Sequence, residues 1–534
     1  MNKKKASKAF GFILKDTSMP CGIIKEILKQ IIIFLLILLT FSLSWGARNF
    51  GNIGLNEIIF TLNMPLKEAS QDFVADYFHR AFFPSLGIWA VELLFALYPF
   101  KIRYYFRISL KGKRDFKWRI LPLAAPLPIF LLVFCVWISG LVFAADRQFG
   151  VFSYVKSQMA NSTFIEEEYV NPTDVQIRFP EKKNNLICIY VESLESSMQD
   201  KENGGIFDIN YIPELTQIAK DNVSFSQSDL IEGAAVAPAS GWTIAGLVAE
   251  TAGLPLKLFE YNGGKGGADN VMRKYQYFLP GAVTLGEILE KEGYSNSIMF
   301  GSKGKFGGRS TYFEQHGNYE VWDYFSAIEE GKIDEDYYEN WGFEDEKLYA
   351  FAKEKLLELA EKNQPFHFSM LTADAHTPNG YLCSQCPSIY EQQYANVLVC
   401  ESRQLSAFVE WISQQSFYQD TTIVICGDHC SMVKNFFGEY AYDKHNGEVT
   451  RKVYNAFIQP LAKPQQEKNR LFTTMDIFPT VVAALGGEIE GNRLGLGTNL
   501  FSKEETLAEK YGYEYLFEEL NKKSRFYDKT ILYP

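Results

Sequence analysis

Positive charge is scarce over most of this 534-residue chain. From residue 151 onward, 34 lysines and arginines stand against 55 aspartates and glutamates, a net charge of −21. Nucleic-acid backbones require a basic surface, so this acidic body excludes nucleic acid as a partner. Residues 1–150 have the opposite balance, with 19 basic and 9 acidic residues. A basic front before an acidic body is typical of a membrane anchor followed by a soluble domain.

Low-complexity sequence and paired zinc-type cysteine motifs are also missing. Hydrophobic residues make up 47% of the chain and aromatic residues 15%, which excludes a disordered protein. A single C-x-x-C pair occurs, at Cys383 and Cys386, whereas zinc usually needs a second pair. The pair could be redox-active, zinc-binding or disulfide-bonded. We favour a structural disulfide that uses Cys383 or Cys386, with Cys400 as a candidate partner.

Three apolar stretches lie in the basic front, at residues 27–45, 81–100 and 120–145. Each is close to the roughly 20 residues that cross a bilayer as a helix. A buried core helix is the alternative, above all for 81–100. No A-x-A site follows the first stretch, which disfavours a cleavable signal peptide. We therefore expect a membrane anchor with about three transmembrane helices over residues 1–147.

Lysine and arginine set the expected orientation of this anchor. They gather at the N-terminus and between residues 101 and 119, whereas the loop between the first two stretches carries Glu57, Glu68, Asp72 and Asp76. By the positive-inside rule, the N-terminus and the second loop are cytoplasmic. Three crossings then place everything after Asp146 outside the cytoplasm. Residues 148–182 are expected to be an interfacial linker, either a helix on the membrane surface or a plain connector.

From residue 183 the pattern changes to short apolar runs separated by helical segments. Buried strands are expected at 186–191, 297–300, 366–371 and 422–426, and helices at 212–221, 284–292, 344–362 and 391–415. This alternation predicts parallel βαβ units, and so an α/β sandwich with a mostly parallel sheet. We expect it to occupy residues 183–505 and to be followed by a C-terminal tail, 506–534.

Polar side chains follow three of the expected strands. Glu192 follows the first, Asp374 and His376 follow the third, and Asp428 and His429 follow the fourth. A polar residue after one strand is usually a turn or a helix cap. Three together favour a common site, because ligands gather at the carboxyl ends of strands in open α/β sheets. Two of the six histidines of the chain lie here.

Thr243 stands at the start of an expected helix rich in Ala, Leu and Val. A threonine at that place is ordinarily an N-cap. A helix N-terminus also favours a phosphate group. Glu192, Asp428 and His429 offer oxygen and nitrogen ligands to a divalent cation, and the Thr243 hydroxyl can be the fourth. A metal lowers the pKa of a bound hydroxyl and makes it a nucleophile.

This set of residues, in this order, resembles the alkaline phosphatase/sulfatase superfamily. More narrowly, it resembles the membrane-bound phosphoglycerol transferases, which include periplasmic glucan phosphoglycerol transferases and lipoteichoic acid synthases. The matching motifs are VESLESS at 191–197, GWTIAGLVAETAGLPL at 241–256, FGGRSTYFEQHG at 306–317, TADAHTPNG at 372–380, GDHCSM at 427–432 and MDIFPTVVAALG at 475–486.

The resemblance implies roles for individual residues. The implied metal ligands are Glu192, Thr243, Asp428 and His429, and Thr243 is also the implied nucleophile. Substrate-phosphate contacts fall on Arg309 and His376, and His376 could protonate a leaving alkoxide.

Three positions carry alternatives or departures. A surface arginine is the alternative interpretation of Arg309. His445 is a further candidate substrate contact, with a surface-loop histidine as the alternative. Phe300 stands where lipoteichoic acid synthases carry a histidine, so their acceptor geometry is not transferred to this chain.

The resemblance implies a transferase that moves sn-glycerol 1-phosphate from phosphatidylglycerol to an envelope glycan or a polyglycerolphosphate acceptor, through a phospho-threonine intermediate. Its cofactor would be one divalent cation, Mn²⁺ first, with Mg²⁺ and Zn²⁺ as alternatives. The implied location is a bacterial inner membrane, with several crossings and a periplasmic catalytic domain.

Three other functions compete with this one. A phosphoethanolamine transferase would use the same fold. A sulfatase-like hydrolase is disfavoured, because the nucleophile position reads TIAGL rather than C/S-x-P-x-R. A non-catalytic membrane sensor is disfavoured by the intact set of ligand residues.

Overall fold

The structure is a computed structural model that describes residues 10–13, 20–49, 55, 58–59, 71–97, 103–110, 113–121, 127–257, 277–362, 364–440, 444–445 and 448–534. The chain divides into two compact units. The first comprises residues 1–49 and 70–148, and the second comprises residues 50–69 and 149–534.

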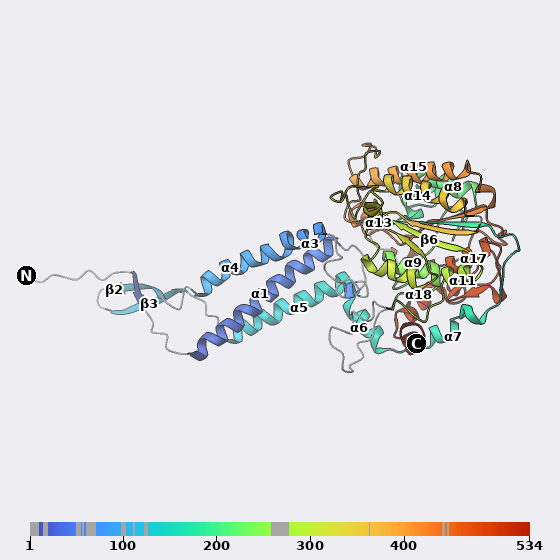
Figure 1. The fold of residues 1–534 in the computed structure, drawn as a ribbon. Helices are drawn as coiled ribbons and strands as arrows, with labels where there is room; N and C mark the ends of the chain where they lie inside the picture. Colours follow the sequence, from blue (N-terminus) through green and yellow to red (C-terminus); the bar gives the residue numbers. More distant parts are fainter. Residues whose placement is uncertain are drawn as a thin grey trace, which may run out of the picture. The chain divides into compact units, whose positions relative to one another are not determined.

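The first unit contains three long helical segments that lie side by side (Figure 1). They are α1 (Pro20–Asn49), the continuous run of α3 (Gln71–Tyr77), η2 (Phe78–Phe82) and α4 (Phe83–Leu97), and α5 (Leu127–Phe149). Tryptophan side chains join them by hydrogen bonds. The Trp45 indole donates to Asp76 Oδ2 at 2.8 Å, and the Trp137 indole donates to Thr40 Oγ1 at 3.1 Å.

Within the described residues, two helices are long and apolar enough to cross a membrane, Ile27–Asn49 and Phe130–Phe149. The third expected span, 120–145, begins later than expected. Its first residues belong instead to strand β3 (Lys113–Leu121), which pairs with β2 (Arg103–Leu110), and β2 pairs in turn with β1 (Phe10–Ile13). The expected span 81–100 corresponds to α4, which continues α3 and η2 in one helical run from residue 71 to residue 97.

A six-stranded sheet forms the centre of the second unit. Its order is β12 (Asn455–Ile458), β9 (Thr421–Gly427), β5 (Asn185–Val191), β8 (Phe366–Leu371), β6 (Ser295–Phe300) and β7 (Glu320–Trp322). All neighbours are parallel except β12, which pairs antiparallel with β9. The predicted α/β fold with a mostly parallel sheet is confirmed, and β7 and β12 add one strand at each edge.

Helices cover both faces of this sheet, as Figure 1 shows. Alternate residues of β5 point to opposite faces, so Cys188 packs in one hydrophobic core and Ile189 in the other. One face carries α8 (Pro213–Asp221), α14 (Asp345–Ala360) and α15 (Gln393–Ser413). The other carries α9 (Thr243–Ala252), α11 (Leu285–Lys291), α12 (Arg309–Gln315), α17 (Ile477–Ala484) and α18 (Leu507–Asn521). Four of the helices, α8, α11, α14 and α15, match the expected segments.

Shorter elements complete the second unit. The helices are α6 (Val151–Met159), α7 (Phe164–Glu168), α13 (Tyr324–Glu329) and α16 (Lys434–Phe437). The strands are β4 (Ile177–Arg178), β10 (Lys444–His445), β11 (Glu448–Val449), β13 (Glu488–Ile489), β14 (Arg493–Leu494) and β15 (Gly497–Thr498).

Most of the expected linker and most of the expected tail pack within the second unit. In the linker, Phe164 and Ile165 of α7 are buried in the main core, and β4 pairs with β13. In the tail, α18 buries Leu516 and Leu520, and Ile531 beyond it is also buried. Apolar residues that are spaced among many charged ones resemble a solvated segment in sequence, and only the packing reveals their partner surface.

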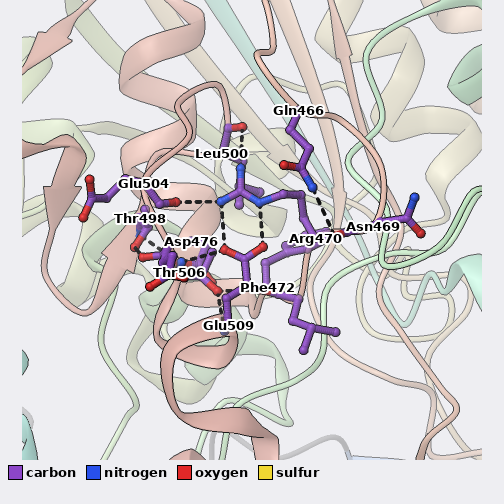
Figure 2. Close-up of polar contacts among 12 residues, drawn as sticks. Gln466, Asn469, Arg470, Phe472, Asp476, Thr498, Leu500, Glu504, Thr506 and Glu509 are labelled. Carbon is purple, nitrogen blue, oxygen red and sulfur yellow. Dashed lines mark hydrogen bonds and ion pairs between the residues drawn. The ribbon is translucent and has the colours of Figure 1, made fainter.

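A buried arginine ties the tail to the domain (Figure 2). Arg470 donates to both carboxylate oxygens of Glu509 in α18, from Nε at 2.7 Å and from Nη2 at 3.0 Å. It also donates to the carbonyl oxygens of Ser502 and Glu504, at 2.9 and 2.7 Å. These bonds hold the start of α18 against the chain that precedes it.

The expected disulfide is not present. The sulfurs of Cys383, Cys386 and Cys400 lie close together, with Cys383 Sγ at 3.5 Å from Cys386 Sγ and 3.6 Å from Cys400 Sγ. All three are unbridged thiols. The sequence spacing correctly predicted that these cysteines lie close together, but the disulfide bond expected between two of them is not formed.

Candidate active site at the strand ends

Two neighbouring strands bring Glu192, and the adjacent Asp428 and His429, to one edge of the sheet. β5 and β9 pair in register from Asn185↔Thr421 to Val191↔Gly427, so Glu192 and Asp428 follow at the same level. His429 Nε2 lies 3.4 Å from Glu192 Oε1 and 3.5 Å from Asp428 Oδ2. All three side chains are buried, and one ligand atom from each lies within 4.8 Å of the others.

Thr243 reaches the same group from α9. It is the first residue of the helix, and Trp242 holds the N-cap position. The Thr243 hydroxyl lies 3.2 Å from Glu192 Oε2 and 3.5 Å from His429 Nε2. The Thr243 side chain therefore points toward Glu192 and His429, and it does not cap the helix.

Gly246 permits this close approach of α9 to β9. A Cβ atom at this position would lie 2.1 Å from the carbonyl oxygen of Asp428. Any side chain would clash with that backbone and push the helix away from the strand end. The motif glycine, three residues after Thr243, thus sets the distance between the hydroxyl and the carboxylates.

Hydrogen bonds orient the ligand atoms. Asp428 Oδ1 accepts from the backbone N–H groups of Ser193 and His429, both at 2.8 Å. Asp428 Oδ2 accepts no hydrogen bond within the described part of the chain, although it is buried. His429 Nδ1 lies 2.9 Å from the Cys430 carbonyl oxygen and donates to it, so Nε2 is the nitrogen that faces Glu192 and Asp428. An unpaired buried carboxylate oxygen beside an available imidazole nitrogen fits a cation ligand set.

The charges of the site support the same interpretation. Burial raises the pKa of Asp428, and the Glu192 charge raises it further. Burial would lower the pKa of His429, but Asp428 and Glu192 outweigh it and raise that pKa to about 10. Without a metal, a protonated His429 balances the two carboxylates. Two carboxylates, one imidazole and one hydroxyl suit a borderline-hard divalent cation, which would supply that positive charge instead.

Arg309 is buried beside this group, so the surface-arginine alternative is wrong. Its Nη2 donates to Ser302 Oγ at 2.9 Å and to the Lys303 carbonyl oxygen at 3.0 Å. Burial lowers the pKa of Arg309 to about 10, while the charge of Glu192 opposes that shift. A guanidinium held this firmly near two carboxylates is a suitable partner for a phosphate group.

His376 lies on the segment after β8, next to an aromatic pair that the sequence analysis missed. Its Nδ1 is 2.9 Å from the Thr377 carbonyl oxygen, which leaves Nε2 for a substrate. The Trp341 ring lies 4.5 Å from the His376 ring, centre to centre, and the Phe306 ring lies 5.1 Å from that of Trp341. A lone tryptophan in a loop carries no sequence signal of such a role. His445 lies in β10, and its side chain is outside the described residues.

A buried ion pair behind the site also escaped the sequence analysis. Arg451 Nε donates to Glu195 Oε2 at 3.0 Å, and its Nη2 donates to the Ser431 carbonyl oxygen at 2.6 Å. The Ser431 N–H donates to Glu195 Oε1 at 2.8 Å. The pair thereby holds the loop that follows Asp428 and His429. Glu195 lies in the VESLESS motif, which was the available signal.

Breaking this pair should destabilise the second unit strongly. In Arg451→Ala, the carboxylate of Glu195 would remain buried without its partner, which typically costs about 3–5 kcal/mol. We expect a clear fall in the thermal unfolding temperature of the purified full chain in detergent. The control is Lys182→Ala, which removes an exposed ion pair with Asp420 that should be worth at most about 1 kcal/mol. Equal unfolding temperatures for the two variants would contradict the role assigned to Arg451.

The solved structures to which the chain is similar include a lipoteichoic acid synthase and a phosphoethanolamine transferase. The lipoteichoic acid synthase LtaP from Listeria monocytogenes is 17% identical, with 64% of this chain and 82% of that one covered and a TM-score of 0.47. The lipooligosaccharide phosphoethanolamine transferase EptA from Neisseria meningitidis is 13% identical, with 86% and 84% covered and a TM-score of 0.47.

Sequence comparisons are more specific. Residues 259–487 match the Sulfatase family model, a range that contains Arg309, His376, Asp428 and His429. Phosphoglycerol transferase I of Escherichia coli is 31% identical over 350 residues, which cover 62% of this chain. The match spans 42% of the length of that relative. Residues 259–487 of the second unit are thus similar to the Sulfatase family, and these two matches confirm the resemblance to the sulfatase-like phosphoglycerol transferases.

Proposed function

We propose that this protein is a membrane-anchored, metal-dependent phosphoglycerol transferase. It would take sn-glycerol 1-phosphate from phosphatidylglycerol and pass it to an envelope glycan or a polyglycerolphosphate acceptor. The observation that carries the proposal is the position of the Thr243 hydroxyl, 3.2 Å from Glu192 Oε2 and 3.5 Å from His429 Nε2 at the start of α9. A hydroxyl placed among metal-ligand side chains is poised to act as a nucleophile.

The reaction would run in two displacements at phosphorus. Thr243 Oγ1 forms a bond to the phosphorus of phosphatidylglycerol, and the bond from phosphorus to the diacylglycerol oxygen breaks. An acceptor hydroxyl then attacks the same phosphorus and frees Thr243. A divalent cation held by Glu192, Asp428, His429 and Thr243, with Mn²⁺ preferred over Mg²⁺ or Zn²⁺, would lower the pKa of the hydroxyl and balance phosphoryl charge.

Arg309 and His376 would both contact the phosphodiester group of the substrate. The Arg309 guanidinium would hold a phosphoryl oxygen through charge-assisted hydrogen bonds. His376 Nε2 would give a proton to the departing diacylglycerol alkoxide and take one from the acceptor hydroxyl. Burial lowers the pKa of His376, which eases its return to the neutral form between the two steps.

The proposed function can be tested by adding labelled lipids to membranes that contain the protein. Phosphatidylglycerol labelled in its head group should transfer label to a polymer, and phosphatidylethanolamine labelled in the same way should not. Recovery and analysis of the labelled polymer identifies the acceptor. Transfer from phosphatidylethanolamine alone would replace the proposal with a phosphoethanolamine transferase.

Metal content gives a separate prediction. Asp428→Ala should lose both bound Mn²⁺ and transferase activity, because the variant lacks the carboxylate that faces His429. Elemental analysis of the purified, Mn²⁺-loaded full chain provides the measurement. Asp420→Ala, which changes an exposed residue directly before the start of β9, is the matched control. Stoichiometric Mn²⁺ in Asp428→Ala would show that these strand-end residues are not the site.

The membrane topology gives another prediction. We propose a multi-pass protein of a bacterial inner membrane whose catalytic unit faces away from the cytoplasm, because basic residues concentrate between residues 101 and 119. An alkaline phosphatase reporter fused after Pro172 should be active, and one fused after Lys111 should be inactive. The reverse pattern would put the site on the wrong side for an envelope acceptor.

A further inference from the structure

Three cysteines form a compact group apart from the strand-end site. Cys383 and Cys386 lie on the segment between β8 and α15, and Cys400 lies in α15. Their sulfur atoms all lie within 4.8 Å of one another. Cys383 and Cys400 are buried, and Cys386 is partly exposed. The proposed function uses none of the three.

The spacing of the sulfurs suits thiolates around one metal ion. Zinc–sulfur bonds of about 2.3 Å in a tetrahedral arrangement place two sulfurs about 3.8 Å apart. Two of the separations here are 3.5 Å, between Cys383 and Cys386, and 3.6 Å, between Cys383 and Cys400. Only small shifts would therefore convert the group into a ligand set.

A second observation supports charged sulfurs. The side-chain amide of Gln404 lies one helical turn after Cys400 and donates to two of the sulfurs, to Cys400 Sγ at 3.3 Å and to Cys383 Sγ at 3.5 Å. N–H groups that point at sulfur favour the thiolate over the thiol and orient it, as the outer hydrogen bonds of metal sites do.

We propose that Cys383, Cys386 and Cys400 form a second metal site, which binds a thiophilic cation of the Zn²⁺ class through three thiolates. Each sulfur would release its proton to solvent as its bond to the metal forms, and nothing is oxidised or reduced. Within the described residues no fourth carboxylate, imidazole or thiol joins the group, so the fourth position is left to water.

The two sites would sort two metals by ligand chemistry. Thiolates favour Zn²⁺ and other soft ions, whereas the oxygen-rich set of Glu192, Asp428 and Thr243 favours Mn²⁺ or Mg²⁺. The thiolate site would also anchor a catalytic segment. His376, Cys383 and Cys386 all lie on the segment between β8 and α15. Within this segment the Tyr381 N–H donates to the Asp374 carbonyl oxygen at 2.7 Å. A metal would tie this segment to α15.

Metal titration of the full chain tests the site. Protein purified in detergent with a reductant should take up one equivalent of Co²⁺ with the intense near-ultraviolet absorption of cobalt–thiolate charge transfer, and Zn²⁺ should displace it. Asp428→Ala should keep this signal, and so should Cys135→Ser, the control cysteine in α5. Cys383→Ser should lose it, and Gln404→Ala should weaken binding about 10–100-fold.

Two results would overturn the proposal. The first is a reduced wild-type protein that binds Co²⁺ without the charge-transfer absorption. This result needs only the wild type, so it is decisive even if Cys383→Ser fails to fold. The second comes from peptide mapping after thiol alkylation without a reductant. A disulfide between any two of these cysteines as the main species in freshly isolated protein would restore the structural-disulfide interpretation.

Discussion

Replacing Thr243 with alanine should abolish transfer and leave the protein folded and inserted in the membrane. The loss of an N-cap hydroxyl costs about 0.5–2 kcal/mol of stability. Here Trp242 holds the N-cap position, so the structural cost should be at the low end of that range. The loss of a nucleophile removes the covalent route. We expect activity to fall by about 1,000-fold or more, which corresponds to about 4 kcal/mol on the barrier.

Three measurements make this prediction specific. Thr243→Ser keeps a hydroxyl and should retain partial activity. Thr251→Ala removes a hydroxyl from the same helix, where it contacts Tyr312 rather than the ligand group, and should retain transfer. Mass analysis of the wild type incubated with phosphatidylglycerol and no acceptor should reveal glycerophosphate on the Thr243 peptide. A folded Thr243→Ala enzyme with near wild-type transfer would refute the mechanism.

Deleting residues 506–534 should prevent the second unit from folding. The segment buries six large apolar side chains: Leu507, Leu516, Leu520, Tyr527, Ile531 and Leu532. At about 1.5–3 kcal/mol for each, their loss amounts to about 9–18 kcal/mol. That is comparable to the roughly 5–15 kcal/mol by which whole domains are stable. The deletion would also leave the Arg470 guanidinium buried without Glu509 (Figure 2).

Protease sensitivity is the measurement for this deletion. The truncated chain should be degraded under conditions that leave the full chain intact. Removal of residues 533–534 alone is the control, because both are exposed. Glu509→Gln isolates the ion pair and should lower the unfolding temperature without abolishing the fold. A protease-resistant, active chain that ends at Glu505 would return residues 506–534 to the role of a dispensable tail.

The central fold was predictable because its elements are locally consistent. The run at 366–371 has four apolar residues and is buried throughout, as expected for a parallel strand covered on both faces, and β8 spans the same residues. The edge strand β7 has three residues, too few for a clear apolar run, and β12 pairs antiparallel, so it lies outside the βαβ pattern. The packing of α7 and α18 depends on a surface that distant segments build, and local patterns do not encode it.

The candidate site was predictable in part for the same reason. Glu192, Asp428 and His429 directly follow strands, so their gathering follows from a parallel sheet. Trp341 and Arg451 have no such local marker. Trp341 meets His376 from a loop 35 positions earlier in the chain, and Arg451 meets Glu195 across 256 positions. The roles proposed for the strand-end residues stay predictions until the variants are measured.

The register of β5 and β9 also determines when the ion site can exist during synthesis. Asp428 accepts a hydrogen bond from the Ser193 N–H across 235 residues of sequence, and β8 must be inserted beside β5 before the sheet is continuous. Contacts of such long range form late, because loop closure is costly until much of the chain is in place. An emerging chain that has delivered Glu192 and Thr243 still lacks Asp428 and His429. In the proposed function, acquisition of the ion would therefore follow synthesis of the chain through His429, and metal occupancy would report that the ends of β5 and β9 have come together.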